Sequence, residues 1–211
     1  MVGGPADVRV LPGLTVTKVA TNPFNNNCYL LASGDGPDDE VVLVDAAGDA
    51  PVLLDLLGGR RLVHVVETHG HWDHWQALAE VVEATGATVL ASAADAGELP
   101  VPVDRFLREG DVVRVGEVEL SVITLVGHTP GSVALHHPGD GGHLWSGDSL
   151  FPGGVGNTEQ DPARFASLFR DVTEKLFDRM PDSTWVYPGH GADTTLGAER
   201  PSLPEWEARG W

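Results

Sequence analysis

The chain has 211 residues, of which 42% are hydrophobic and 21% charged, as in an ordinary globular protein. Its formal net charge of -18 disfavours phosphate backbones and anionic membranes, so we expect neither nucleic-acid nor membrane partners. The only cysteine, Cys28, excludes an internal disulfide, and the N-terminal MVGGPADVRV lacks the basic and apolar segments of a signal peptide. We therefore expect a cytoplasmic protein with a single domain over residues 1–211.

Predicted strands and helices alternate in the first half of the chain. The polar stretch SGDGPDDE at 33–40 is expected at a hairpin tip. VVLVD at Val41–Asp45 and LVHVVET at Leu62–Thr68 are β-branched runs typical of buried strands. A helix is predicted over Trp75–Thr85, ending before a glycine, and a further strand over Ala87–Ser92.

The second half is predicted to be mainly strands with one clear helix. The strand-like runs are Asp111–Val115, Glu117–Val126, Ser132–His137, His143–Ser146 and Thr184–Tyr187. The helix begins with Asp161 as N-cap and Pro162 as its first residue, and apolar residues then recur at helical spacing. In the tail after His190, we expect Trp206 and Trp211 to anchor the chain to the body of the protein.

The segment ETHGHWDHW places three histidines and an aspartate in the loop between a predicted strand and a predicted helix. His69 and His71 are two residues apart, so in extended backbone their rings project to the same side. Asp73 and His74 follow where the chain turns and can point elsewhere. Imidazole and carboxylate are the ligands that borderline divalent metals prefer, so this segment predicts a metal site.

Three later residues occupy similar positions after predicted strands. His128 lies in GHTPGS, Asp148 in SGDSLF and His190 in YPGHG, each beside a glycine-containing turn. Taken singly, each could be a capping or surface residue. As a set with the first segment, they could converge on one edge of a sheet sandwich.

The order THGHWDH, GHTPGS, SGDSLF and PGHG resembles the metallo-β-lactamase-fold hydrolases, and most closely their glyoxalase II (hydroxyacylglutathione hydrolase) branch. This resemblance implies an α/β fold, a four-layer αββα sandwich with the metals at one edge of the sheets. It further implies that two divalent metal ions are bound, Zn first, with Fe or Mn also accepted. The implied ligands are His69, His71 and His128 for the first ion, Asp73, His74 and His190 for the second, and Asp148 as the bridge.

The resemblance also implies the chemistry. Two such ions sharing a water lower its pKa from ~15.7 towards ~7, so that it can attack an ester-like carbonyl. Asp73 is the expected catalytic acceptor that orients this water. The expected substrate is a small-molecule thioester or ester, with the acyl group carried by a low-molecular-weight thiol; the composition of the chain suggests a thiol other than glutathione, such as mycothiol. Only 21 residues follow His190, too few for the glutathione-binding domain of glyoxalase II.

Two residues depart from the pattern of relatives. Trp72 stands where relatives often have a small residue; core packing is the favoured interpretation and an aromatic wall for the substrate the second. Asn157 stands where relatives often carry arginine, so a change in substrate contacts is expected. Other functions stay open: a persulfide dioxygenase with one iron, a lactone or ester hydrolase, or a metal-stabilised scaffold.

Overall fold

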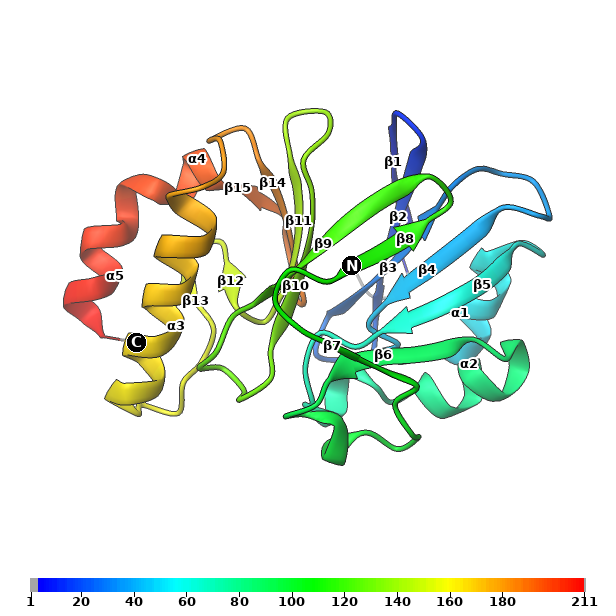
Figure 1. The fold of residues 1–211 in the computed structure, drawn as a ribbon, viewed down its shortest axis with the longest axis horizontal. Helices are drawn as coiled ribbons and strands as arrows, with labels where there is room; N and C mark the ends of the chain where they lie inside the picture. The colour runs from blue at the N-terminus through cyan, green and yellow to red at the C-terminus, as the bar shows by residue number, and fades with distance from the viewer. Residues whose placement is uncertain (1–3, 211) are drawn as a thin grey trace.

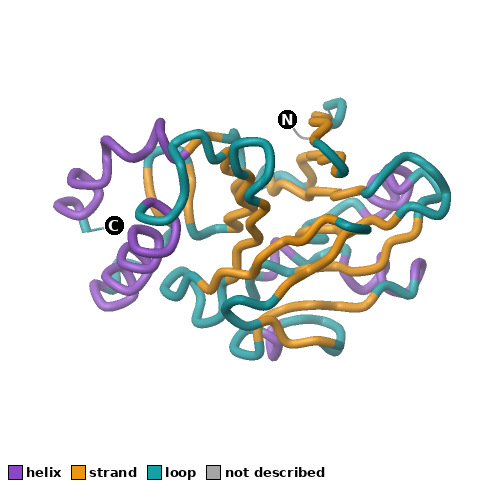
Figure 2. Tube along the Cα trace, turned by 45° about the horizontal axis from the view of Figure 1, so that its top comes forward, coloured by secondary structure: helices purple, strands orange, loops and turns teal. Residues whose placement is uncertain are grey.

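The computed structural model describes residues 4–210. In this part of the chain the strands form two large sheets and one small hairpin, and the helices lie at the two outer sides (Figure 1). Trp211, one of the two predicted anchors of the tail, lies outside the described residues. Figure 2 shows the same arrangement from a second direction, with the strands between the helices.

The first sheet has the strand order β1-β2-β3-β4-β5-β6-β7. Strands β1 to β4 pair antiparallel, and β4 to β7 pair parallel. The bounds are β1 Asp7–Leu11, β2 Leu14–Thr21, β3 Asn26–Ala32, β4 Glu40–Val44, β5 Arg61–Val66, β6 Thr88–Ser92 and β7 Arg105–Leu107. The predicted strands at β4, β5 and β6 and the hairpin tip between β3 and β4 are confirmed.

The second sheet has the strand order β15-β14-β11-β10-β9-β8, in which only the β11–β14 pair of the described strands is parallel. The bounds are β8 Val112–Val115, β9 Val118–Thr124, β10 Val133–His137, β11 His143–Gly147, β14 Trp185–Pro188 and β15 Thr194–Thr195, with a small hairpin of β12 Leu150–Phe151 and β13 Gly154–Val155. The predictions for β8, β9, β10, β11 and β14 are confirmed.

The helices cover the outer faces of the two sheets. On the first sheet lie α1 Ala50–Leu57 and α2 Leu78–Thr85, and on the second α3 Pro162–Val172, the short α4 Leu196–Glu199 and α5 Leu203–Arg209. Short helical turns are η1 Trp72–His74, η2 Ala96–Glu98, the π-helical η3 Thr173–Phe177 and η4 Arg200–Ser202.

The N-cap predicted for α3 is confirmed, because the Asp161 carboxylate accepts hydrogen bonds from the backbone N–H groups of Ala163 and Arg164. The helix predicted over Trp75–Thr85 begins three residues later than expected. The residues before it do not continue the helix, because Ala77 N donates to Ala46 O (2.9 Å), just after β4, and not to a helical partner.

Apolar side chains fill three spaces between these layers. One cluster lies between the two sheets, one under α1 and α2, and one under α3 and α5. Trp206 is buried in the third cluster beside Phe177, so the prediction that it anchors the tail is confirmed. Cys28 is buried in the second cluster, as expected for a small apolar residue. The described part of the chain is thus the predicted αββα sandwich.

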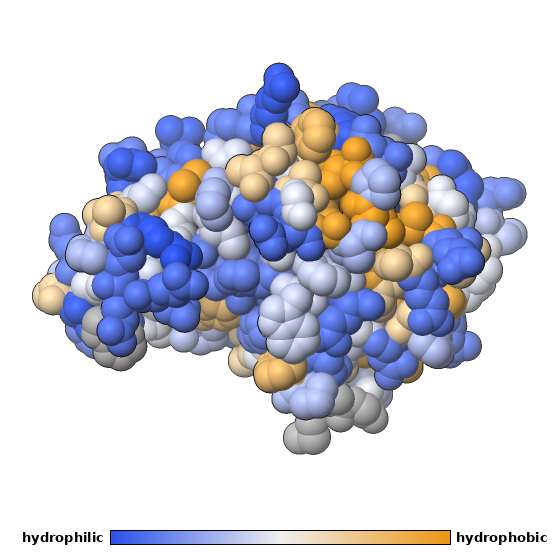
Figure 3. Space-filling view, turned by 90° about the horizontal axis from the view of Figure 1, so that it is seen from below, coloured by the Kyte–Doolittle hydropathy of each residue, from blue (hydrophilic) through white to orange (hydrophobic). Residues whose placement is uncertain are grey.

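The face seen in Figure 3 is mostly hydrophilic, with one large apolar area at the upper right and smaller apolar spots elsewhere. Among residues 4–210, the structure contains no helix with the length and apolar character needed to cross a bilayer.

Candidate metal centre

The seven predicted ligand residues meet at the edge where several strands end. His69, His71, Asp73 and His74 follow β5, and His128, Asp148 and His190 follow β9, β11 and β14. Because β11 and β14 are parallel neighbours, Asp148 and His190 leave the second sheet at the same edge. We call these seven residues the metal centre.

One half of the metal centre consists of three histidines. Ligand atoms of His69, His71 and His128 lie within 4.8 Å of one another. The ring centroids of His71 and His128 are 4.5 Å apart, and those of His69 and His71 are 4.8 Å apart. Three imidazoles at these separations can bind one ion together.

The other half consists of Asp73, His74 and His190, whose ligand atoms also lie within 4.8 Å of one another. The Nε2 atoms of His74 and His190 are 3.1 Å apart, and His190 Nε2 is 3.5 Å from Asp73 Oδ2. This half matches the donor set expected for a second ion.

Asp148 lies between the two halves. Its Oδ2 is 3.6 Å from His128 Nε2 in the first half and 3.4 Å from His190 Nε2 in the second. Its Oδ1 is 3.4 Å from His74 Nε2. One carboxylate therefore faces donors of both halves, which is the position that a bridging ligand would occupy.

The hydrogen bonds of the first half direct Nε2 lone pairs into the metal centre. His128 Nδ1 donates to the backbone oxygen of Asn157 (2.8 Å), because a carbonyl only accepts. His69 Nδ1 lies 3.0 Å from Thr68 Oγ1, which already donates to Asp45 Oδ2 and so accepts from the imidazole. Each ring then carries its proton on Nδ1, and its Nε2 is a free ligand atom.

The same holds in the second half. His74 Nδ1 donates to the buried Asp45 carboxylate (2.8 Å), and His190 Nδ1 donates to the backbone oxygen of Phe24 (3.0 Å). In the neutral rings, the two Nε2 lone pairs would then face each other across 3.1 Å. Two lone pairs repel at this distance, and a cation or a proton between them removes the repulsion.

The buried polar atoms support the fit to a metal. Within residues 4–210, His69 Nε2, His128 Nε2 and Asp148 Oδ1 are buried without a hydrogen-bond partner. Buried polar atoms normally have a partner, so such a cluster needs an explanation. Nitrogen and oxygen donors aimed at one space suit a divalent ion, and the residues therefore fit the metals that the sequence predicted.

The pKa shifts show where positive charge is favoured. Burial lowers the pKa of His69, assisted by the positive charge of nearby His74. Burial would also lower the pKa of His74, but Asp148 and Asp45 outweigh it and raise this pKa well above its usual value. Burial would raise the pKa of Asp148, yet His74 and His190 hold it well below its usual value. The protein alone thus keeps a proton where a cation would bind.

Asp45 is a functional residue that the sequence prediction missed. Its carboxylate is buried and accepts from Thr68 N (2.7 Å), Thr68 Oγ1 (2.9 Å) and His74 Nδ1 (2.8 Å). Asp45 also lies close enough to His69 and His74 to form a ligand triad. Because its oxygens are already occupied by these donors, we assign it to orienting His74 rather than to binding an ion. In the sequence it is only the last residue of the predicted strand Val41–Asp45, so no local signal marked its role.

Two other buried residues support the centre and were also missed. Glu67 lies behind Asp45, where its Oε1 accepts from Ala46 N (3.2 Å), and burial together with the Asp45 charge raises its pKa well above its usual value. Asn26, fully buried at the start of β3, donates from Nδ2 to Asp73 Oδ2 (3.0 Å). Nothing in the run NNN distinguishes Asn26 from its neighbours, because its partner lies 47 residues away.

Gly189 of the PGHG motif allows the segments to approach so closely. A Cβ atom at this position would lie 2.1 Å from Asp148 Oδ1 and 2.8 Å from His74 Cε1. These distances are far shorter than any non-bonded contact, so a side chain would push Asp148 out of the metal centre.

The structure corrects the favoured interpretation of Trp72. Trp72 is 56% exposed, so it is not a core residue. Its ring contacts exposed Phe24 edge to face, with centroids 5.5 Å apart. The second interpretation, an aromatic wall for the substrate, stays a prediction.

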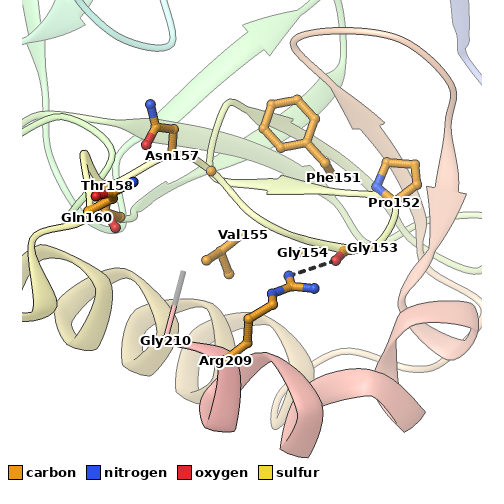
Figure 4. A pocket seen from close by; sticks show the side chains of 11 residues that line it. Phe151, Pro152, Gly153, Gly154, Val155, Asn157, Thr158, Gln160, Arg209 and Gly210 are labelled. Atoms are coloured by element: carbon orange, nitrogen blue, oxygen red, sulfur yellow. Dashed lines mark hydrogen bonds between the residues drawn. The ribbon is translucent and has the colours of Figure 1, made fainter.

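Asn157 lines a pocket of about 760 Å³ beside the metal centre (Figure 4). The pocket lies between the β12–β13 hairpin and α5, and Arg209 on α5 donates to Gly153 O (3.1 Å). Phe151, also in its wall, has its ring centroid 6.3 Å from that of His190. The pocket is therefore large enough and near enough to hold part of a substrate.

The fold and the site define a protein of the αββα class with a histidine- and aspartate-rich centre suited to divalent metals. Residues 21–190 match the metallo-beta-lactamase superfamily, and the chain belongs to this superfamily.

Several known proteins are similar to it. A hydroxyacylglutathione hydrolase from Fuscovulum blasticum is 42% identical over 169 residues, which are 79% of this chain and 62% of the relative. The chain thus spans less than two thirds of this relative's length. The crystal structure of TTHA1623 in a di-iron-bound form has a TM-score of 0.72 and 34% identity, covering 89% of this chain and 98% of that one. ETHE1 from Myxococcus xanthus has a TM-score of 0.76 and 30% identity, covering 92% and 84%.

Proposed function

We propose that the chain is a metal-dependent hydrolase with two divalent ions, and that it cleaves acyl thioesters of a low-molecular-weight thiol. The observation that carries this proposal is the place of Asp148, with oxygens 3.4 to 3.6 Å from imidazole nitrogens of both halves. The similarity to a hydroxyacylglutathione hydrolase supports the thioester class, and the di-iron form of TTHA1623 supports two ions. The proposed metal is Zn, and the same ligands accept Fe or Mn.

The first ion would be held by His69, His71 and His128, the second by Asp73, His74 and His190, and Asp148 would contact both. When bound, the ions lower the pKa of a water molecule and polarise the substrate carbonyl. The protein supplies the remaining functions.

Asp73 is proposed to orient the attacking water and accept its proton. Asn26 Nδ2 fixes Asp73 Oδ2 by a hydrogen bond of 3.0 Å, so the direction of the carboxylate is set before the substrate arrives. The side chain of Asp73 is 20% exposed, which gives it access to the substrate side of the metal centre.

The carrier thiol is proposed to occupy the pocket lined by Phe151, Asn157 and Arg209. This pocket offers an aromatic ring, an amide and a guanidinium, which suit a thiol with polar groups. It also adjoins the metal centre through the hydrogen bond between Asn157 O and His128, so the leaving sulfur would depart towards it.

Metal content and activity together test the proposal. We expect purified protein to carry about two ions per chain by elemental analysis and to hydrolyse thioesters in a panel that also contains esters and lactones. If protein loaded with two ions leaves every thioester intact but opens lactones or cleaves oxygen esters, the same centre belongs to a lactone or ester hydrolase.

A persulfide dioxygenase is the second candidate, favoured by the similarity to ETHE1. It would use the first half of the metal centre with one iron. One iron per chain, with oxygen consumed on a persulfide substrate and no thioester cleavage, would replace the hydrolase proposal with this one. A metal-stabilised scaffold would show metal content with neither activity.

A further inference from the structure

Two aromatic rings lie exposed beside the metal centre and contact each other. Phe24 is 55% exposed and Trp72 is 56% exposed, with ring centroids 5.5 Å apart in an edge-to-face arrangement. Trp72 comes directly between His71 of the first half and Asp73 of the second. Large apolar rings on an acidic, mostly hydrophilic protein are a sign of a binding surface when they lie together at a site. We call Phe24 and Trp72 the aromatic shelf.

The backbone fixes the aromatic shelf to the metal centre. The carbonyl of Phe24 accepts from His190 Nδ1 (3.0 Å), and its N–H donates to Asn22 Oδ1 (3.0 Å). Asn22 Nδ2 in turn donates to the backbone oxygen of Asp73 (3.3 Å). The turn that carries Phe24 is therefore joined to His190 through the carbonyl of Phe24 and to Asp73 through Asn22. Both His190 and Asp73 belong to the second half. A shelf held in this way needs little ordering when it binds a ligand.

A cavity of about 330 Å³ lies on the Trp72 side of the metal centre. Its wall contains His71 from the first half, together with the rings of Trp72, Trp75 and Pro130. A cavity of this size with aromatic and proline walls next to a reacting centre suits an apolar acyl chain.

The polar groups of this cavity disfavour an anion. Asp95 Oδ2 accepts from Gly70 N (3.0 Å) and Thr129 Oγ1 (2.5 Å), so this oxygen already has its partners. Glu98, also in the wall, is exposed, and its carboxylate would repel a negatively charged ligand. The cavity therefore suits a neutral group.

We infer that the aromatic shelf and this cavity bind the acyl group of the substrate and select neutral, apolar acyl groups. This inference rests on the proposed thioester or ester hydrolysis and adds the substrate class. The larger pocket at Asn157 remains for the carrier, and the two pockets are lined by different described residues. His71 lies in the wall of the smaller cavity, and His128 donates to Asn157 of the larger pocket; the centroids of these two rings are 4.5 Å apart. A substrate that spans both pockets would therefore place its carbonyl at the metal centre.

Acyl-chain selectivity tests the inference. The probes are acetyl and octanoyl thioesters of N-acetylcysteamine, hydrolysed by the metal-loaded protein. We expect the wild type to prefer octanoyl in kcat/KM, and the double variant Phe24→Ala, Trp72→Ala to lose about tenfold of the octanoyl-to-acetyl ratio, mainly through KM. The conservative variant Phe24→Leu, Trp72→Phe keeps an apolar shelf and should retain most of the preference.

Phe106→Ala is the matched control, because Phe106 is another half-exposed phenylalanine and lies on β7 outside the shelf. It should leave the ratio unchanged. An octanoyl-to-acetyl ratio that is the same in the alanine double variant and the wild type would overturn the inference. Preference for an anionic succinyl thioester over neutral butyryl would overturn it as well.

A binding measurement separates this inference from the proposed function. The probe is a ketone analogue of the octanoyl thioester, in which CH₂ replaces the sulfur. It is titrated into metal-loaded protein, and its binding is measured by calorimetry. We expect the alanine double variant to bind this analogue about tenfold more weakly than the wild type, and this result supports the acyl site. If it is found while no thioester is cleaved, only the proposed reaction fails. Equal affinity for wild type and double variant overturns the acyl site whatever the activity.

Discussion

Replacing Asp45 by asparagine would test how the second half of the metal centre is oriented. The two carboxylate oxygens accept three hydrogen bonds, one at Oδ1 from Thr68 N and two at Oδ2 from Thr68 Oγ1 and His74 Nδ1. In either orientation, the amide of asparagine directs an NH₂ group at one or more of these donors. At least one bond to a charged acceptor is lost, which costs about 1.5–3 kcal/mol of unfolding free energy.

The same substitution should weaken metal binding. His74 loses the negative partner that fixes its Nδ1 proton and strengthens Nε2 as a ligand, and such changes typically reduce metal affinity by about 10–100-fold. Competition with a chromogenic chelator measures the affinity, and urea unfolding of the metal-free protein measures the stability.

Asp49→Asn provides the matched control. Asp49 also has a left-handed backbone (φ 55° against 58° for Asp45), is exposed, and makes no capping bond from its side chain within the described chain. It should change neither quantity. If Asp45→Asn binds metal as tightly as Asp49→Asn does, the assignment of Asp45 to orienting His74 is refuted.

Three further outcomes are expected. Asp148→Ala should lower the metal content from about two ions to one or fewer and remove turnover, and unchanged content and turnover would contradict the bridging role. Metal affinity should rise from pH 6 to pH 8, because the pKa values of His74 and His190 are raised and protons therefore compete with the ion at low pH. Chelator competition measures this affinity, and equal affinity at the two pH values would count against the prediction. Burial raises the pKa of Cys28 from 9.0 to about 12, so iodoacetamide should modify it at pH 8 only after unfolding, as measured by mass spectrometry. Since this pKa is raised in the folded state, the neutral Cys28 thiol contributes to the free energy of unfolding. This contribution is fully present below pH 9.0 and is lost as the pH rises towards about 12.

The αββα architecture was predicted through the family resemblance rather than from the strands alone. Local patterns located β4, β5 and β6, because buried parallel strands are continuous β-branched runs. No strand was predicted at β1, β2 or β3, although β3 is buried along its whole length. For β1 the physical reason is exposure, because its Val8 and Val10 are 62% and 76% exposed at a sheet edge. An edge strand lacks the burial that makes a run recognisable.

The sequence by itself determined the candidate ligands in two ways. The segment from His69 to His74 is a dense, local cluster of metal donors, whereas His128, Asp148 and His190 were assigned through the resemblance of their motifs to a known family. Asp45 and Asn26 could be assigned only from the tertiary structure. Each acts on a partner more than twenty residues away, and the contact exists only because particular strands became neighbours. The exposure of Trp72 was decided in the same way, since whether a ring is covered depends on what the rest of the chain packs against it.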